Sequence, residues 1–479
     1  MHIIQYATFF IYFALLLGIG LLTTHKQKTD TEFILGDRSL NFWLTALSAH
    51  ASDMSSWLFL AYPALIYSGG LFNTWAAIGL TIFMYCNWQF IAPRIRIITE
   101  QTNSLTLNAY FENRIVDPGG KIRIVSAIIS LLFYTIYISS GLIGMGLLVE
   151  TLFNLHYWMG ISLGLFIVML YVFLGGYKTV AWIDLVQGFF LLGVIVFIPI
   201  YLLVKIESFD KAASAAKTLH LTTSLFPDFS SKTWLQIFFL TCGWGLGYFG
   251  QPHIITKFMG IKNIRDIFKS MILGLSWQIT ALIAATLIGF LGIFYFPEKL
   301  SNPELLILSI VKEYFFPFFA GLVLCAILAA TTNVMAAQIL VAASSLSEDF
   351  YKRLVQRDAT SSDLLRVSRI SVVLISITAF VIAFFKISTI YKLVFYAWAG
   401  LGSAFGPLLL TSLYSKKINR HGGLWGIIVG GLIGALWPAL KSEIPAMLPG
   451  FCLSLFTIYL VSYITKYYEG KNEKYTASE

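Results

Sequence analysis

The feature of this sequence that most constrains its fold is a succession of about thirteen apolar stretches, each long enough for a helix to cross a lipid bilayer. A helix needs about 20 mostly apolar residues to span the hydrocarbon core. Only 12% of the 479 residues are charged, whereas soluble domains carry about 25%. We therefore predict an all-α polytopic membrane protein in which residues 1–479 form a single transmembrane domain. The stretches are centred near Phe10, Met54, Thr81, Tyr137, Phe166, Leu191, Leu240, Ala284, Asn333, Ile377, Leu401, Val429 and Thr457.

The distribution of basic residues predicts how these helices are oriented. With the N-terminus outside, the inward loops and the C-terminal tail hold 24 of the 33 lysines and arginines. This excess is the positive-inside pattern of membrane proteins. It predicts an outside N-terminus and an inside C-terminus in the cytoplasmic (inner) cell membrane. Because topology accounts for the net charge of +9, we expect membrane lipid around the chain and no nucleic acid as a partner.

Two of the stretches contain residues that interrupt a helix. The second contains "SAHASDMSSW" (residues 48–57), in which four serines surround Asp53 and can bond to the backbone in place of the helix. The seventh contains "CGWGLGYFGQP" (residues 242–252), in which each of four glycines costs about 1 kcal/mol of helix stability. Transporters bind solutes between interrupted helices, because unwound carbonyls and amides become ligands there. We predict a solute site where Ser52–Trp57 faces Trp244–Tyr248; the alternative is that the small residues only allow close helix packing.

The spacing of these two stretches predicts an internal repeat. They are five stretches apart, and a unit with an odd number of spans is inverted when it is repeated. We therefore expect residues 41–205 to form a first repeat and residues 233–415 a second. Residues 1–30 would add an extra N-terminal helix, and residues 423–467 two C-terminal helices.

Three polar residues in the apolar stretches are candidates for a functional role. Asp53 lies near the centre of its stretch, where a carboxylate costs roughly 2.5–3.5 kcal/mol, so we expect it to serve an ion or solute path; the alternative is a carboxylate held by the nearby serines. Asp184 has two interpretations: an acid beside Lys178 that the helix dipole stabilises in a first turn, or part of an inner ion pathway. His50 lies one turn before Asp53 and is either a titrating group or a buried histidine with satisfied hydrogen bonds.

Aromatic residues near the predicted breaks are candidates for the solute site. Trp244 and Tyr248 are four residues apart and so share one helical face, and Tyr137 lies in the middle of the fourth stretch. In a chain with 40 Phe, 24 Tyr and 12 Trp, the alternative for each is ordinary packing. Arg38 is most simply an anchor at the inner end of the second stretch.

Several long runs of this sequence resemble the sodium:solute symporter family, most closely its sodium/proline branch. The resemblance extends from about Phe33 to Gly450. It implies a LeuT-type fold of two inverted five-helix repeats with additional helices. It also implies a secondary symporter that imports a small amino acid, with L-proline expected, by alternating access driven by a sodium gradient. The runs are "FILGDRSLNFWLTALSAHASDMSSWLFLAYP", "LFYTIYISSG", "WIDLVQG", "GWGLGYFGQPHI", "AILAATTNVMAAQILVAASSLSEDFYK" and "YAWAGLGSAFGP".

The resemblance also implies roles for individual residues. Asp53 corresponds to the essential acid of the first broken helix, Asp184 to the acid on the inner sodium route, and Arg38 to the arginine before the broken helix. The implied solute site comprises Ser55, Trp57, Tyr137, Trp244 and Tyr248. The implied sodium site comprises the carbonyls of Ala51 and Met54 and, on a facing helix, Ala330, Asn333 and Val334.

The sodium site departs from the family at two positions. The family pattern has serine or threonine where this chain has Asn333 and Val334, and Val334 has no oxygen in its side chain. Thr331 and Thr332 do not replace these positions simply, because a shift of two residues turns a helix by roughly 200°. Three explanations follow: weakened sodium coupling with Asn333 as a ligand, proton coupling through Asp53, Asp184 or His50, or uncoupled facilitation. The alternative function is a proton-coupled or otherwise coupled carrier for another small solute.

Other classes of function receive less support from the sequence. A solute-sensing membrane module is a distant alternative, because the chain ends at "YEGKNEKYTASE" without room for a signalling domain. No phosphate-binding loop, zinc motif or nucleophile elbow is present, so we do not expect an enzyme. We expect a small-molecule partner and no cofactor beyond the coupling ion, sodium or alternatively a proton.

Overall fold

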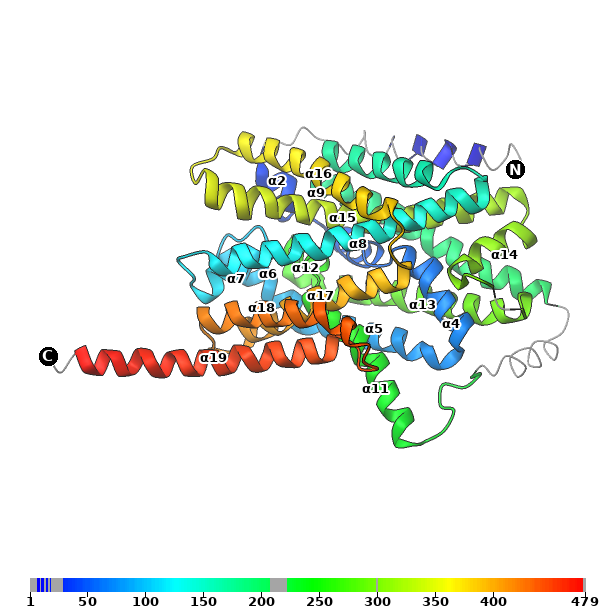
Figure 1. Ribbon diagram of the computed structural model, residues 1–479. Coiled ribbons are helices and arrows are strands. Elements are labelled where there is room, and N and C mark those ends of the chain that lie inside the picture. Colours follow the sequence, from blue (N-terminus) through cyan, green and yellow to red (C-terminus); the bar gives the residue numbers. More distant parts are fainter. Residues whose placement is uncertain are drawn as a thin grey trace.

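The computed structural model is a bundle of helices, most of which lie nearly parallel to one another (Figure 1). The structure describes residues 29–206, 222–298 and 300–476, together with residues 7, 8, 10–12, 14, 15 and 18. The side chains of residues 171, 174 and 467–476 are not described. The extra helix predicted for residues 1–30 therefore lies mostly outside the described residues.

Eight of the described helices are long and apolar enough to cross a membrane. Two shorter apolar helices, Trp57–Gly69 and Tyr157–Leu170, accompany them. The prediction of an all-α, multi-pass bundle is confirmed, whereas the number of thirteen spans stays a prediction. The eight helices are Lys121–Phe153, Gly175–Lys205, Ile264–Tyr295, Pro317–Val355, Ser361–Phe384, Ile390–Tyr414, Arg420–Leu440 and Met447–Lys466.

The first half of the chain is built from short helices followed by two long ones. Polar residues set several of the starts: the Asn41 side chain accepts from the Leu44 amide at 2.9 Å at the start of α3, and Thr106 caps α7 in the same way. The elements are α2 Asp30–Leu35, η1 Gly36–Arg38, α3 Phe42–Ala51, η2 Trp57–Ala61, α4 Tyr62–Gly69, η3 Leu71–Asn73, α5 Thr74–Cys86, η4 Asn87–Ile91, α6 Ala92–Gln101, α7 Leu107–Ile115, α8 Lys121–Phe153 and α9 Tyr157–Lys205.

The second half contains the remaining long helices. Ser230, Thr360, Thr389 and Asn419 cap the starts of α11, α16, α17 and α18. The elements are α11 Ser231–Gly245, η5 Leu246–Gly250, α12 Pro252–Met259, η6 Ile264–Asp266, α13 Ile267–Tyr295, η7 Pro303–Leu305, α14 Leu306–Tyr314, α15 Pro317–Ser344, η8 Ser345–Val355, α16 Ser361–Phe384, α17 Ile390–Tyr414, α18 Arg420–Leu436, η9 Trp437–Leu440 and α19 Met447–Thr476.

A glycine divides the 49-residue element α9 into two helices. Gly176 has a φ of 58°, a backbone conformation that residues with a side chain rarely adopt. A Cβ atom at this position would also lie 2.8 Å from the Phe33 ring. The bend therefore needs glycine, and it separates the two apolar stretches that the sequence predicts around Phe166 and Leu191.

The interrupted segments lie among the long helices. On one side, α3 packs against α9, α13 and α15. On the other, η5 packs against α17 and α5, and α17 also contacts α8 and η2. The two segments, far apart in the sequence, thus both lie against α17, which contacts η2 of the first and η5 of the second, and they can form one site.

Candidate functional site

The second apolar stretch is interrupted between α3 and the π-helical turn η2. The Ser52 hydroxyl donates to a carbonyl one turn earlier at 2.5 Å, and the Ser55 hydroxyl accepts from the Trp57 amide at 3.2 Å. These side chains replace bonds of the helical ladder. Within the described part of the chain, the backbone bonds that cross this break leave the carbonyls of Ala51 and Met54 unused. The break therefore exposes two acceptors inside the bundle.

The seventh stretch is interrupted at η5, a tighter 3-10 segment between α11 and α12. Gly247 lies directly against the Trp398 indole, so a Cβ atom there would overlap it. The indole N–H of Trp398 donates to the Trp244 carbonyl at 2.7 Å and satisfies an acceptor that the break releases. Gln251 is extended, as expected for a residue before a proline, and Pro252 then begins α12. The glycines and the proline thus account for the position of the break.

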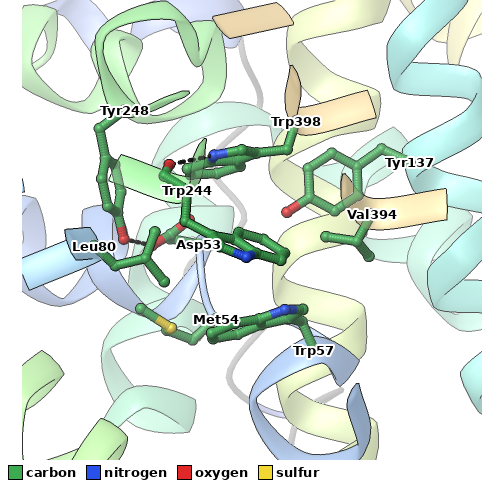
Figure 2. Close-up of a pocket in the computed structure, with 9 residues that line it drawn as sticks. All are labelled: Asp53, Met54, Trp57, Leu80, Tyr137, Trp244, Tyr248, Val394 and Trp398. Atoms are coloured by element: carbon green, nitrogen blue, oxygen red, sulfur yellow. Dashed lines mark hydrogen bonds between the residues drawn. The ribbon is translucent and has the colours of Figure 1, made fainter. Parts of the chain in front are cut away.

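The two breaks meet at a small pocket (Figure 2). The Asp53 carboxylate points towards Tyr248, whose hydroxyl donates a short hydrogen bond to it. The Gln278 amide donates to the same hydroxyl at 3.2 Å, so the phenolic proton is left for Asp53. Asp53 is only 6% exposed, and none of the ion pairs among the described residues involves it. The partner of its carboxylate is therefore the neutral Tyr248 hydroxyl, and no cation pairs with it among the described residues.

Aromatic side chains form most of the pocket wall. The ring centroids of Trp57 and Trp244 are 5.1 Å apart, and Tyr248 meets Trp398 edge-on at 5.1 Å. Tyr137 enters from α8 on the side opposite Tyr248 (Figure 2). The free volume of the pocket is about 10 Å³, enough for about one water molecule and far below the roughly 300–1,000 Å³ of ordinary small-molecule sites. The pocket is therefore nearly filled by its own side chains, and its rings must part to admit a solute.

Most of the predicted solute residues lie together in this pocket. Ser55 is buried but does not line it; its hydroxyl serves the backbone of the break instead. Leu80, Val394 and Trp398 line the pocket and were not predicted. Trp398 lies within the recognised run "YAWAGLGSAFGP", whereas Leu80 and Val394 have no polar or helix-breaking signal. The predicted residues that line the pocket are Trp57, Tyr137, Trp244 and Tyr248.

The predicted ion site contains an unsatisfied amide. Asn333 is fully buried in α15, and neither its oxygen nor its nitrogen has a hydrogen-bond partner within the described protein. Ala330 and Val334 are buried on the same helix, which packs against α3. A hard cation prefers oxygen ligands. The unpaired Asn333 oxygen and the unused carbonyls of Ala51 and Met54 are oxygen donors of the kind that such a cation prefers.

Asp184 belongs to a buried polar cluster. Its carboxylate accepts from the Ser48 hydroxyl at 2.5 Å and pairs with Lys257 at 3.2 Å. Lys257 is 2% exposed and belongs to α12, so the cluster joins α3, α9 and α12. The interpretation of Asp184 as a first-turn acid beside Lys178 is wrong. Asp184 lies about two turns beyond the bend at Gly176, and Lys178 lies 3.8 Å from an acidic side chain of α2.

Arg38 joins three separate segments. Its guanidinium donates to the carbonyls of Thr99, Ser104 and Met259 at 2.9, 3.0 and 2.8 Å. Burial, and secondly the neighbouring charge of Arg96, lower the pKa of Arg38 to about 10. The side chain remains protonated at neutral pH and acts as a clamp between α6, the loop after it and α12.

His50 forms part of the core beside the pocket. The Trp88 indole N–H donates to its Nε2 at 3.0 Å, which places the single proton of a neutral imidazole on Nδ1. The ring is 0% exposed. His50 is thus a buried, neutral histidine, but its Nδ1 has no hydrogen-bond partner among the described residues, so the expected satisfaction of both ring nitrogens is not seen.

Comparisons with known proteins agree with this architecture. A family model described as the sodium:solute symporter family matches residues 33–430. The chain is 40% identical to a protein of Staphylococcus saprophyticus named sodium/proline symporter 2, over 96% of this chain and 93% of that protein. It is 37% identical to a Bacillus subtilis protein named high-affinity proline transporter PutP, over 94% and 96% of the two chains.

A solved structure has the same fold. It is described as a substrate-bound, outward-open state of a Na+-coupled sialic acid symporter, with a TM-score of 0.84 and 18% sequence identity. The match covers 97% of this chain and 98% of that one. The predicted LeuT-type fold class is thereby confirmed.

Proposed function

Because the chain belongs to the sodium:solute symporter family, we propose that it is a secondary active symporter of the cell membrane that imports L-proline with sodium by alternating access. The observation that carries this proposal is the identity of 37–40% to proteins named as sodium/proline symporters or proline transporters. The aligned regions cover 94–96% of this chain and 92–96% of those relatives.

We propose that proline binds in the pocket between the two breaks. Trp57, Tyr137, Trp244 and Tyr248 would enclose the pyrrolidine ring, whose apolar faces pack well against aromatic rings. Ser55 would act indirectly, by fixing the backbone of the first break. The solute carboxylate is suited to the first turn of η2, since half-helix N-termini in such transporters face anionic groups.

Sodium is proposed to bind between α3 and α15. Its ligands would be the carbonyls of Ala51, Met54 and Ala330 and the amide oxygen of Asn333. Val334 would only pack against the site. The unpartnered state of the Asn333 amide supports this assignment, because a cation would satisfy its oxygen. A sodium ion here would also offset the charge of Asp53 in the adjacent break.

An inner route for sodium through Asp184 is part of the proposal. Lys257 holds that carboxylate at 3.2 Å, so sodium and the lysine ammonium would compete for it during release. Arg38 would hold α6, the loop after it and α12 together during the release of sodium. The proposal also includes an outside N-terminus, an inside C-terminus, and inverted repeats over residues 41–205 and 233–415.

Uptake of labelled L-proline into proteoliposomes tests the function. A sodium gradient and a proton gradient are imposed separately on the purified full-length protein. We expect accumulation with sodium alone. Accumulation with protons alone would contradict the proposed ion site, and failure to accumulate proline under either gradient would contradict the proposed solute.

Replacement of the central acid tests the coupling. Asp53→Asn keeps the size of the side chain and its contact with Tyr248 but removes the negative charge. We expect sodium-driven accumulation to be abolished. Asp358→Asn, at an exposed turn after η8, is the matched control and should accumulate proline like the wild type. Near-normal accumulation by Asp53→Asn would contradict the assigned role.

A further inference from the structure

A second cavity shares α8 with the pocket and is also lined by α12, the helix that follows the second break. On α8, Tyr137 lines the pocket and Ser130 lines the second cavity; seven residues of an α-helix span about 10.5 Å. Pro252, the first residue of α12 after the second break, also lines it. Its free volume is about 10 Å³, the same as that of the pocket, so both must widen to admit a solute. We call this space the lower cavity.

A layer of two side chains separates the lower cavity from the pocket along α8 and α12. Tyr134 lies between Tyr137 and Ser130 on α8, and its hydroxyl accepts from the backbone amide of His253 at 2.9 Å. Tyr134 and His253 are both 0% exposed. The lower cavity is therefore a separate compartment on the path that the broken helices define.

Ser130 offers the lower cavity an unused hydroxyl. The side chain is 1% exposed, and its oxygen has no hydrogen-bond partner within the described protein. Other hydroxyl groups of α8 behave differently and donate to a carbonyl of their own helix, at 2.6 Å in each case. Those residues are Ser126, Thr135, Ser139 and Ser140. Ser130 is thus available both to donate and to accept.

The start of α7 supplies further hydrogen-bonding groups to the lower cavity. Asn108 is 3% exposed and donates to Asp349 at 2.8 Å and to Ser345 at 3.1 Å, but its side-chain oxygen has no partner in the described chain. The backbone amides of Leu107 and Asn108 donate none of the hydrogen bonds found among the described residues. Both residues line the lower cavity at the positive end of the nine-residue helix α7.

The charge nearest to these groups is already compensated. Asp349 accepts from Thr106 at 2.9 Å as well as from Asn108, and it pairs with Arg123 at 2.6 Å. None of the side chains that line the lower cavity is charged. An anionic group of a ligand is therefore not repelled by an unpaired carboxylate, and a cationic group meets no oppositely charged side chain there.

We propose that the lower cavity is a second solute-binding site of the transport path, which takes a small zwitterionic amino acid. The solute carboxylate accepts from the Ser130 hydroxyl and the first turn of α7, and the solute amino group donates to the Asn108 oxygen. This proposal rests on the proposed function, because the same solute occupies both sites in turn. The Tyr134–His253 layer separates the two occupied positions.

Transport measured from both sides of the membrane tests the second site. Oriented proteoliposomes containing the full-length protein give the external half-saturation constant from uptake of labelled L-proline and the internal constant from its efflux. Ser130→Ala removes no hydrogen bond within the protein, so it should fold normally. We expect it to raise the internal constant about tenfold, as loss of a hydrogen bond to a charged group implies, and to change the external constant less than about twofold. Ser130→Val, which also occupies the free space beside Ser130, should show the same asymmetry more strongly.

Ser126→Ala provides the matched control, because this buried serine of the same helix bonds to its own backbone and does not line the lower cavity. Both of its constants should equal those of the wild type. Unchanged constants in both Ser130 variants would mean that the lower cavity holds only water, and equal changes on the two sides would assign Ser130 to the general stability of the carrier; either result overturns the proposal. Failure of the wild type to move proline would overturn the proposed function itself, and it is recognised without any variant.

Discussion

The Asn333 side chain allows the proposed ion site to be tested through stability as well as transport. It is 0% exposed, and both polar atoms of its amide lack partners in the described structure. A buried polar group left unsatisfied costs about 1–3 kcal/mol. Asn333→Leu keeps the branched shape of the side chain, replaces its two polar atoms by methyl groups and removes that cost. We therefore expect the sodium-free variant to be more stable than the sodium-free wild type by about 1–3 kcal/mol.

Sodium should narrow or reverse this difference in stability. An ion that binds only the folded protein stabilises it by about 2.7 kcal/mol at one hundred times its dissociation constant. The wild type should gain this amount, whereas Asn333→Leu lacks the amide oxygen and should gain much less. The assay is thermal unfolding of the detergent-solubilised protein in choline chloride and in sodium chloride at equal ionic strength.

Two results would refute this reasoning. One is a lower unfolding temperature of Asn333→Leu than of the wild type in choline chloride, which would mean that the amide is satisfied without an ion. The other is an equal gain from sodium in both proteins. Thr331→Val is the matched control on the same helix: its hydroxyl bonds to the Ile327 carbonyl at 2.7 Å, and its loss should leave the sodium response unchanged.

Three further changes test the surroundings of the site. Lys257→Met should lower the free energy of unfolding by about 3–5 kcal/mol, because it leaves Asp184 buried without its cation, and the added change Asp184→Asn should restore most of the loss in the same unfolding assay. Tyr248→Phe removes the donor to Asp53 and should raise the sodium half-saturation constant for uptake about tenfold; an unchanged constant would show that the contact is incidental. Arg38→Lys keeps the charge but cannot reach three carbonyls as a rigid fork, so it should reduce both the unfolding temperature and the uptake rate, and wild-type values for both would disprove the clamp.

The sequence predicted the parts of the site that depend on local chemistry. Serines around Asp53 and glycines around Tyr248 compete with a helical backbone wherever they occur, so the two breaks are visible without tertiary information. The division of α9 at Gly176 was predicted in a different way, from the two apolar stretches around Phe166 and Leu191 on either side of it. Trp244 and Tyr248 were found because they lie within a break.

Residues that depend on long-range packing were not predictable. Leu80 and Val394 line the pocket only because α5 and α17 pack against η5, and neither residue differs from any other apolar residue in a span. Lys257 is one of the 24 basic residues that the positive-inside pattern assigns to the inward loops, but the fold buries it against Asp184. Ser130 and Asn108 had no signal at all, because an unused hydroxyl or amide oxygen is recognised only when every potential partner has been placed.

The clamp formed by Arg38 has a consequence for how this protein diverges from its relatives. Its bonds to Ser104 and Met259 reach backbone carbonyls, which every amino acid has. Point substitutions at these two positions therefore leave the clamp intact, and natural selection can let them drift. An insertion or deletion in either segment moves the carbonyl itself. Homologues that keep an arginine here should accordingly vary in residue type at both positions while keeping the lengths of the two segments constant.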